Sequence, residues 1–180
     1  MRYLALLRGI NVGGNNLIKM ADLKACFEKA GFTNVSTYIQ SGNVIFEDKE
    51  QDVEILETKL EQILAERFNY KATVLVRSAK QMSATVLSFP KIFHDDSWKH
   101  NVIFLGADFD RPDILNHFDP KPDIEEIHYS PGVIYWSANL DTITKSNMLK
   151  LATKKEYQKM TVRNQNTTRK LDLLMNETKG

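Results

Sequence analysis

The chain has little of what most enzyme signatures are built from. It contains one cysteine, Cys26, and four scattered histidines in 180 residues. One cysteine cannot form an intrachain disulfide, and it favours a reducing, cytoplasmic location. Cys26 stands among apolar residues at helical spacing, which is typical of a buried structural thiol. The run His94-Asp95-Asp96 is only a weak metal-ligand grouping, and we therefore expect no metal and no cofactor.

Long apolar runs and standard catalytic motifs are also missing. No stretch approaches the length of a membrane span, and the N-terminus lacks a signal-peptide pattern, so we expect no membrane partner. The glycines Gly9, Gly13 and Gly14 have neither dinucleotide spacing nor a phosphate-loop ending, and there is no Gly-x-Ser-x-Gly elbow. The sequence does not indicate whether the protein is an enzyme.

An excess of either charge is missing too, because the formal net charge is +1. The charges are nevertheless segregated along the chain. Residues 91–130 hold nine acidic and four basic residues, whereas residues 145–170 hold eight basic residues and one acidic residue. The basic segment could face phosphate, RNA or the acidic middle of its own chain. Nothing in the pattern indicates an oligomeric state.

What the sequence does contain is clear periodicity. Residues 1–90 predict a ferredoxin-like βαββαβ domain in an α+β fold. The strands expected there are residues 3–8, 35–39, 44–46 and 71–77, and the helices begin at Met20, Asp52 and Ser78. The unbroken apolar run of the first strand indicates burial on both faces.

Residues 91–180 predict a smaller, related α/β domain with basic C-terminal helices. We expect a charged connector over 91–100, a strand over 101–105, a short helix over 112–118, a hairpin over 124–137, and helices near 146–157 and 167–175. The segments Ser41-Gly-Asn-Val-Ile-Phe46 and Ser130-Pro-Gly-Val-Ile-Tyr135 are alike, which suggests two related units. The likeness is short, so two independent hairpins would also explain it.

The best candidate site is the loop Arg8-Gly-Ile-Asn-Val-Gly-Gly-Asn-Asn16. Glycine and asparagine tolerate a left-handed backbone, so amide groups can turn toward one point and bind an anion. The other interpretation is an ordinary strand-to-helix turn. In a split βαβ unit this loop and the hairpin turn leave the sheet at the same end. The ligand-binding candidates are Arg8, Asn11, Gly13, Gly14, Asn15, Gln40, Ser41 and Asn43.

A second pair of candidates, Arg163 and Asn164, stands just before the last expected helix. One interpretation is structural, with Asn166 or Thr167 capping that helix. The other is that Arg163 and Asn164 bind an anion at the helix N-terminus and complete the Arg8 site from across the domain junction.

Two motifs carry a resemblance to a known family. Leu6-Leu-Arg-Gly-Ile-Asn-Val-Gly-Gly14 and Thr37-Tyr-Ile-Gln-Ser-Gly-Asn-Val-Ile-Phe46 closely resemble a family of uncharacterised bacterial proteins, catalogued only as a domain of unknown function. The resemblance continues through Ser88-Phe-Pro90 to Thr161-Val-Arg-Asn164. The chain departs from the family at Gln165, where a Trp is usual, and at Val162, which interrupts a Thr-Arg pair. The resemblance implies the two-domain fold described above, and no activity is known that it could imply.

Three functions remain open on this basis. The first is the binding of an anionic small molecule, a phosphate or a carboxylate, at the loop after the first strand. The second is an RNA- or phosphate-backbone-binding module that uses the basic C-terminal segment. The third is a non-catalytic protein-interaction domain.

Overall fold

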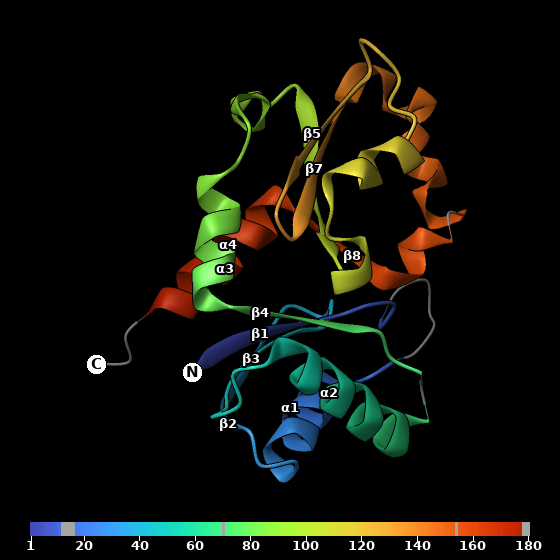
Figure 1. Ribbon diagram of the computed structural model, residues 1–180. Coiled ribbons are helices and arrows are strands. Elements are labelled where there is room, and N and C mark those ends of the chain that lie inside the picture. Colours follow the sequence, from blue (N-terminus) through green and yellow to red (C-terminus); the bar gives the residue numbers. More distant parts are fainter. Residues whose placement is uncertain (12–16, 70, 154, 178–180) are drawn as a thin grey trace. The chain divides into compact units, whose positions relative to one another are not determined.

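The computed structural model describes residues 1–11, 17–69, 71–153 and 155–177 (Figure 1). The chain divides into two compact units. The first unit comprises residues 1–82 with 171–180, and the second comprises residues 83–170. The two changes of unit fall inside helices α3 (Ala79–Leu87) and α4 (Gln165–Asn176). The sequence-based division at residues 90 and 91 remains a prediction about independently folding domains.

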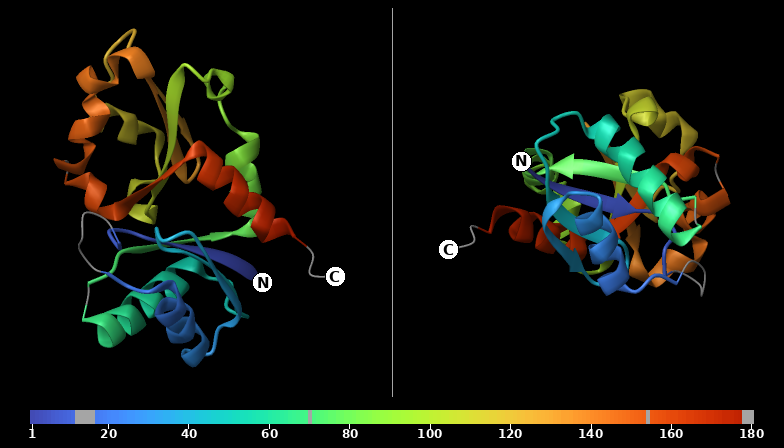
Figure 2. Two further views of the ribbon diagram at one scale, coloured as in Figure 1. Left: turned by 180° about the vertical axis from the view of Figure 1, so that it is seen from behind. Right: turned by 90° about the horizontal axis from the view of Figure 1, so that it is seen from below.

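The first unit has the predicted βαββαβ order. Its elements are β1 (Arg2–Leu7), α1 (Met20–Lys29), β2 (Thr33–Tyr38), β3 (Asn43–Glu47), α2 (Val53–Phe68) and β4 (Val74–Ser78). The four strands form one antiparallel sheet in the order β2-β3-β1-β4. This is the order that the split βαβ arrangement requires. Helices α1 and α2 both cover one face of this sheet (Figure 2).

The core of the first unit lies between this sheet and its two helices. Strand β1 is central in the sheet, and its residues Tyr3–Leu7, which alternate between its two faces, are at most 1% exposed. Helix α2 places Leu56, Leu60 and Leu64 in the same core at helical spacing. Its first residue is preceded by the N-cap Asp52, whose carboxylate accepts from the Glu54 amide at 2.9 Å. These features confirm the predicted helix start and its apolar face.

The second unit repeats this strand arrangement with shorter helical connections. Its elements are the 3₁₀ segment η1 (Lys91–His94), β5 (Trp98–Leu105), η2 (Ala107–Phe109), η3 (Pro112–His117), β6 (Glu125–Ser130), β7 (Val133–Asn139), η4 (Leu140–Lys145), η5 (Asn147–Thr153), η6 (Glu156–Lys159), β8 (Met160–Asn164) and the first part of α4. The sheet order is β6-β7-β5-β8, and all neighbours are antiparallel. Substituting β5–β8 for β1–β4 therefore reproduces the first sheet, which agrees with the expectation of two related units.

This unit differs from the sequence-based expectation at three places. The helix expected near residues 146–157 consists of the separate 3₁₀ segments η5 and η6. Strand β8 was not predicted, although it pairs with β5 over five residues. The connector expected over 91–100 contains η1, and β5 already begins at Trp98.

The likeness between the two hairpins is real but shifted by one residue. The amide of Leu7 donates to the Gly42 carbonyl at 2.8 Å, and the amide of Leu105 donates to the Gly132 carbonyl at 2.9 Å. Gly42 therefore corresponds to Gly132, and both have a positive φ. The letter-by-letter alignment had placed Gly42 opposite Pro131. Backbone conformation, not the shared Val-Ile pair, sets the correct register.

Candidate functional site

The loop after β1 is joined to the β2–β3 turn by the side chain of Asn11. Its Nδ2 donates to the carbonyl of Ile18 at 2.9 Å and to the carbonyl of Gln40 at 3.0 Å. Its Oδ1 accepts from the Ile18 amide at 2.8 Å. One carboxamide thus closes the loop on itself and ties it to the turn. The carboxamide of Asn11 is committed to the protein, so Asn11 positions the site and does not offer a vacant amide.

The β2–β3 turn is held by a second asparagine. Asn43 is fully buried, and its Nδ2 donates to the Tyr38 carbonyl at 3.0 Å and to Ser41 Oγ at 2.9 Å. Gly42, between Ser41 and Asn43, has φ of 73°, and a Cβ there would lie 2.8 Å from the Cβ of Leu7. Only glycine fits this approach of the turn to β1.

Arg8 follows directly on β1 at the same end of the sheet. Asn43 pairs with Leu6 in the sheet, so the expected juxtaposition of the Arg8 loop and the Asn43 turn is present. The Arg8 amide donates to the Thr73 carbonyl at 2.9 Å, which anchors the start of the loop, and the Arg8 side chain is half-buried. Gln40 is exposed, and Ser41 is half-buried. The candidates Gly13, Gly14 and Asn15 lie outside the described residues.

Left-handed backbone is concentrated at this end of the sheet. Gly9 has φ of 72°, Asn11 of 53°, Ile39 of 49° and Gly42 of 73°. A β-branched residue such as Ile39 rarely adopts this conformation, because its Cβ branches collide with the backbone. Ile39 is also 49% exposed, so the strain is not compensated by burial of its side chain.

The second pair of candidates, Arg163 and Asn164, ends β8. Asn164 Oδ1 accepts from the Thr167 amide at 2.8 Å, so Asn164 itself caps α4. The cap had been expected at Asn166 or Thr167, and that assignment is wrong because the helix begins at Gln165. That Arg163 and Asn164 contribute to the Arg8 site stays a prediction.

Arg163 is buried, with 7% of its surface exposed. Its guanidinium donates to Thr161 Oγ1 and to the Val162 carbonyl, both at 2.8 Å. Burial lowers the pKa of Arg163 to about 10, an effect that the nearby Tyr157 opposes. The guanidinium therefore has a structural role within the second unit.

Arg77, the counterpart of Arg163 in the first unit, was not among the candidate site residues. Arg77 pairs with Leu4 of β1 as Arg163 pairs with Val102 of β5. Arg77 is also 7% exposed and donates to the carbonyl of the preceding residue at 2.8 Å. Ser78 follows it and caps α3 with Gln81. The signal that could have found this pair is the shared pattern Val-Arg-Ser and Val-Arg-Asn before a helix.

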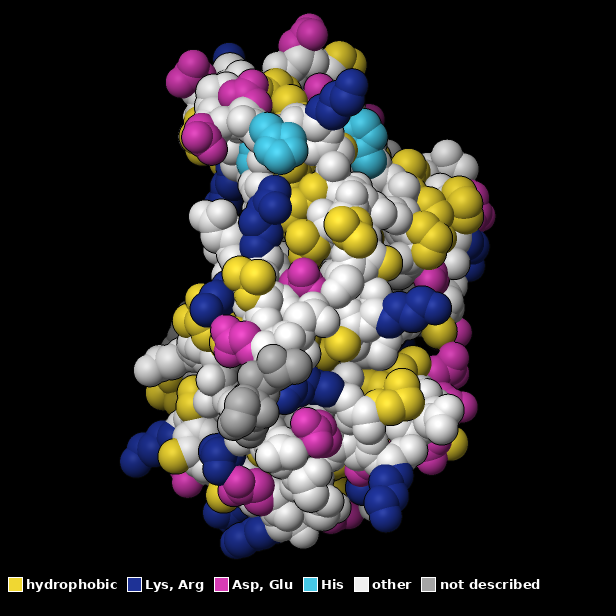
Figure 3. Space-filling model, turned by 90° about the vertical axis from the view of Figure 1, so that its left-hand side faces the viewer, with side chains coloured by type: hydrophobic (Ala, Val, Ile, Leu, Met, Phe, Trp, Pro, Cys, Tyr) yellow, Lys and Arg dark blue, Asp and Glu magenta, His cyan; other side chains and the backbone are white. Residues whose placement is uncertain are grey.

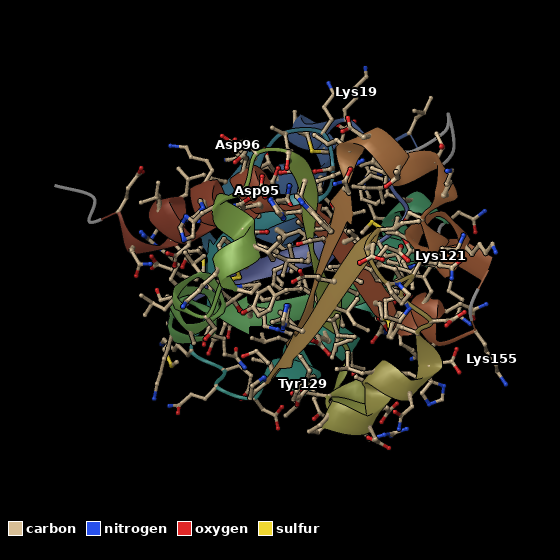
Figure 4. The ribbon with its side chains drawn as sticks, turned by 90° about the horizontal axis from the view of Figure 1, so that it is seen from above. Lys19, Asp95, Asp96, Lys121, Tyr129 and Lys155 are labelled. Carbon is tan, nitrogen blue, oxygen red and sulfur yellow. The ribbon has the colours of Figure 1, made fainter. Side chains whose placement is uncertain are left out.

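The corresponding end of the second sheet carries the opposite charge. The position equivalent to Arg8 is Gly106, whose amide donates to the Lys159 carbonyl at 3.0 Å. The loop there is tied to the β6–β7 turn by Asp110, whose Oδ1 accepts from the Gly132 amide at 2.6 Å and from the Tyr129 hydroxyl at 2.9 Å (Tyr129 is labelled in Figure 4). A carboxylate thus takes the tying role that a neutral carboxamide has in the first unit.

Within the part of the chain that the structure describes, no three His, Cys, Asp or Glu side chains gather in a group that could hold a metal ion. His100 is buried, with Nδ1 at 2.8 Å from Ser137 Oγ and Nε2 at 2.9 Å from the Asp95 carbonyl. Hydrogen bonds from Ser97 lower the pKa of the Asp95 carboxyl. Cys26 is buried as expected, and burial raises the pKa of its thiol. Among the described helices, none has the length and apolar character needed to cross a membrane.

The fold and this site define an α+β protein of two related four-stranded antiparallel sheets. The chain belongs to the family described as a protein of unknown function, DUF1697, which it matches over residues 1–135. It is similar to the solved structure described as the conserved bacterial protein SP0830 from Streptococcus pneumoniae, with 25% sequence identity and a TM-score of 0.86. That similarity covers 97% of this chain and 98% of the other. No curated protein matches the chain.

Proposed function

We propose that the first unit binds an anionic small molecule, a phosphate or a carboxylate, where the loop after β1 meets the β2–β3 turn. The observation that carries the proposal is the Asn11 carboxamide, which bonds to both Ile18 and Gln40. This link holds the loop that begins with Arg8 against the turn that contains Ser41. A guanidinium and a hydroxyl carried by adjoining segments at one end of the sheet are suited to an anion, because both can donate to its oxygens.

Backbone strain at this end of the sheet supports a role beyond stability. Residues forced into the left-handed region cost about 1–3 kcal/mol each when they are not glycine, and they cluster at ligand sites. Asn11 and Ile39 both lie in that region, on the loop and on the turn respectively; asparagine tolerates it, so the strain is that of Ile39. A plain connection could use glycine at the exposed Ile39 position at lower cost.

The comparison of the two units gives independent support. In the second unit the Arg8 position is Gly106, and the residue tying loop to turn is Asp110. That end would repel an anion, whereas the first unit presents a cation beside a neutral carboxamide. The two sheet ends are otherwise similar, and they differ in charge. The positive charge that an anionic ligand requires is present only at the end in the first unit.

The RNA-binding alternative depends on exposed cations in residues 145–170. Arg163 is buried, and Arg169 lies over the ring of Phe89 at 4.7 Å, so neither is a simple surface charge. Lys155 does point outward (Figure 4). On the face shown in Figure 3, Lys and Arg side chains are scattered among Asp and Glu. Phosphate-backbone binding favours a basic patch or stripe, so this alternative depends on the exposed lysines of residues 145–170.

A thermal-shift titration with phosphate, sugar phosphates and small carboxylates tests the proposal. At a concentration of about 100 times Kd, a bound ligand adds about 2.7 kcal/mol of stability. This corresponds to about 5–11 °C for a chain of this size. Arg8→Gln should weaken binding by about 1.5–3 kcal/mol, the scale of a charged hydrogen bond.

Arg111→Gln is the matched control, because Arg111 is half exposed and pairs with Asp113 at 2.9 Å in the other unit. It should bind the anion as the wild type does. Equal stabilisation of wild type and Arg8→Gln would end the proposal. Salt-dependent binding to mixed oligonucleotides would favour the RNA alternative, and no response to either ligand class would leave the protein-interaction domain.

A further inference from the structure

The second unit contains a cavity that the proposed anion site does not use. It has a volume of about 110 Å³ and is lined by Phe118, Asp119, Trp136, Asn147, Lys150 and Leu151. Trp136 and Leu151 are buried, whereas Asp119 and Lys150 are exposed, so the cavity runs from the surface toward the core. An apolar cavity of about 150 Å³ holds benzene, so this one accommodates about four non-hydrogen atoms, and the carboxylate of a somewhat larger ligand would lie at the mouth beside the exposed Lys150.

The walls of the cavity are fixed by a buried carboxylate. Glu125 is 5% exposed, and its Oε1 accepts from Trp136 Nε1 at 3.2 Å, from the Met148 amide at 2.9 Å and from the Ser146 hydroxyl. Its Oε2 accepts from the amide of Lys121, labelled in Figure 4, at 2.9 Å. The indole is thereby locked, and the chain on both sides of Asn147 is held in place. Such a preorganised wall lowers the entropy cost of binding.

One polar atom at the cavity lacks a partner. Asn147 Nδ2 donates to the Asp119 carbonyl at 2.6 Å. Asn147 Oδ1 is buried and accepts no hydrogen bond from any residue that the structure describes. A buried acceptor without a donor is unfavourable, so an occupant that donates to it is favoured.

The charges and the apolar wall of the cavity indicate which chemical groups its occupant carries. Asp119 and Asn147 Oδ1 both accept, which suits a protonated amine. Lys150 lies three residues after Asn147 in the 3₁₀ segment η5, so both lie on one side of it, and Lys150 suits a carboxylate. Phe118 and Trp136 meet edge to face at 5.5 Å and supply an apolar wall.

We propose that this cavity binds a small zwitterionic amino acid with a short apolar side chain. Its ammonium group is received by Asp119 and Asn147 Oδ1, its carboxylate by Lys150, and its side chain by the Trp136 wall.

Tryptophan fluorescence provides the test. The chain has two tryptophans, Trp98 and Trp136, and Trp98→Phe leaves the one in the cavity wall as reporter. This variant is titrated with 2-aminobutyrate, with propylammonium, which lacks the carboxylate, and with butyrate, which lacks the ammonium. The expected result is a saturable change with the zwitterion at a lower concentration than with either fragment.

Two charge-removing variants separate the ends of the ligand. Asp119→Asn retains the backbone carbonyl that holds Asn147 and should weaken 2-aminobutyrate and propylammonium about tenfold while leaving butyrate unchanged. Lys150→Gln should weaken 2-aminobutyrate and butyrate and leave propylammonium unchanged. Asp113→Asn, an exposed carboxylate away from the cavity lining, is the control and should change nothing.

The proposal is overturned if none of the three probes produces a saturable change, or if Asp119→Asn and Asp113→Asn behave alike. Equal affinity for all three probes would also overturn it, because it would show an apolar cavity without recognition of charge. Arg8→Gln should leave this titration unchanged, so failure here is distinguishable from failure of the anion site.

Discussion

Replacement of Asn11 by glycine isolates the contact on which the proposed site depends. Asn11 has φ of 53°, a conformation that glycine adopts without strain, so the backbone can keep its course. The substitution removes only the carboxamide and its bonds to Ile18 and Gln40. The loop then loses its attachment to the β2–β3 turn.

The expected magnitude follows from these bonds. The side chain makes three hydrogen bonds of 2.8–3.0 Å, each with a net contribution of about 0.5–1.5 kcal/mol. Ile18 is 7% exposed, so its amide and carbonyl regain little hydration when the carboxamide is removed. We therefore expect Asn11→Gly to lower the free energy of unfolding by about 2–3 kcal/mol, and anion affinity to fall with it.

Urea unfolding followed by circular dichroism measures this change, and Asn69→Gly is the control. Asn69 has φ of 49° at the exposed C-cap of α2, so it undergoes the same substitution in the same backbone conformation. It should change stability by only a few tenths of a kcal/mol. If both variants shift the midpoint equally, the carboxamide does not hold the loop, and the argument for the site fails.

Three further predictions concern positions where the structure sets the sign of the effect. Gly42→Ala should lower the free energy of unfolding by about 3 kcal/mol or more, because the new Cβ would lie 2.8 Å from the Cβ of Leu7 in β1. Gly31 has φ of +93° and nothing within 4 Å, so Gly31→Ala should cost only about 1–2 kcal/mol in the same urea unfolding measurement. Burial raises the pKa of the Glu125 carboxyl, but its hydrogen bonds lower the pKa by more, so the pKa in the folded protein lies below the ordinary 4.5. The stabilisation by the ionised carboxylate is therefore lost as the pH falls through the folded pKa. Glu125→Gln should flatten the acid limb of a stability–pH curve, and an unchanged limb would contradict this. Burial raises the pKa of Tyr135 to about 12, and its hydroxyl donates to the Thr85 carbonyl at 2.8 Å. An absorbance titration should therefore show one tyrosine that ionises at higher pH than the others, and Tyr135→Phe should remove that step. The free energy of unfolding should decline as the pH rises above 10, the ordinary tyrosine pKa.

The first unit could be predicted from its sequence because local pattern and tertiary environment agree there. The apolar run Tyr3–Leu7 indicates a central strand, and it is one. Asp52 stands where a helix needs an N-cap, and its carboxylate fills that role. Each signal is contained in a few adjacent residues, so no knowledge of distant contacts was required.

The second unit was less predictable because its signals are weaker than its contacts. Strand β8 is only Met160–Asn164 and includes an arginine, a threonine and an asparagine, so its pairing with β5 decides its conformation. One helix was expected near residues 146–157. Glu125 instead holds the amide of Met148 and the hydroxyl of Ser146, and the segment forms short 3₁₀ turns.

Candidate side chains could be named from the sequence, but their roles could not. Asn11 and Asn43 were named as ligand-binding candidates, and the side chains of both donate to carbonyls of the protein. The Gln40 carbonyl that Asn11 reaches is 29 residues away in sequence. The juxtaposition of the loop and the turn followed from topology, whereas the use of each polar group depends on which backbone carbonyls lie nearby in the folded chain.

The duplication of the fold separates shared structural residues from residues specific to one unit. Arg77 and Arg163 hold equivalent positions, are equally buried and donate to the carbonyl of the preceding residue. A feature present in both units serves what both units have in common, which is the junction from the last strand to the following helix. Arg8 has Gly106 as its counterpart, so its charge serves nothing that the second sheet also needs. A function confined to the first unit therefore has its best candidate in Arg8, and Arg163 is the residue whose loss should first be measured as stability.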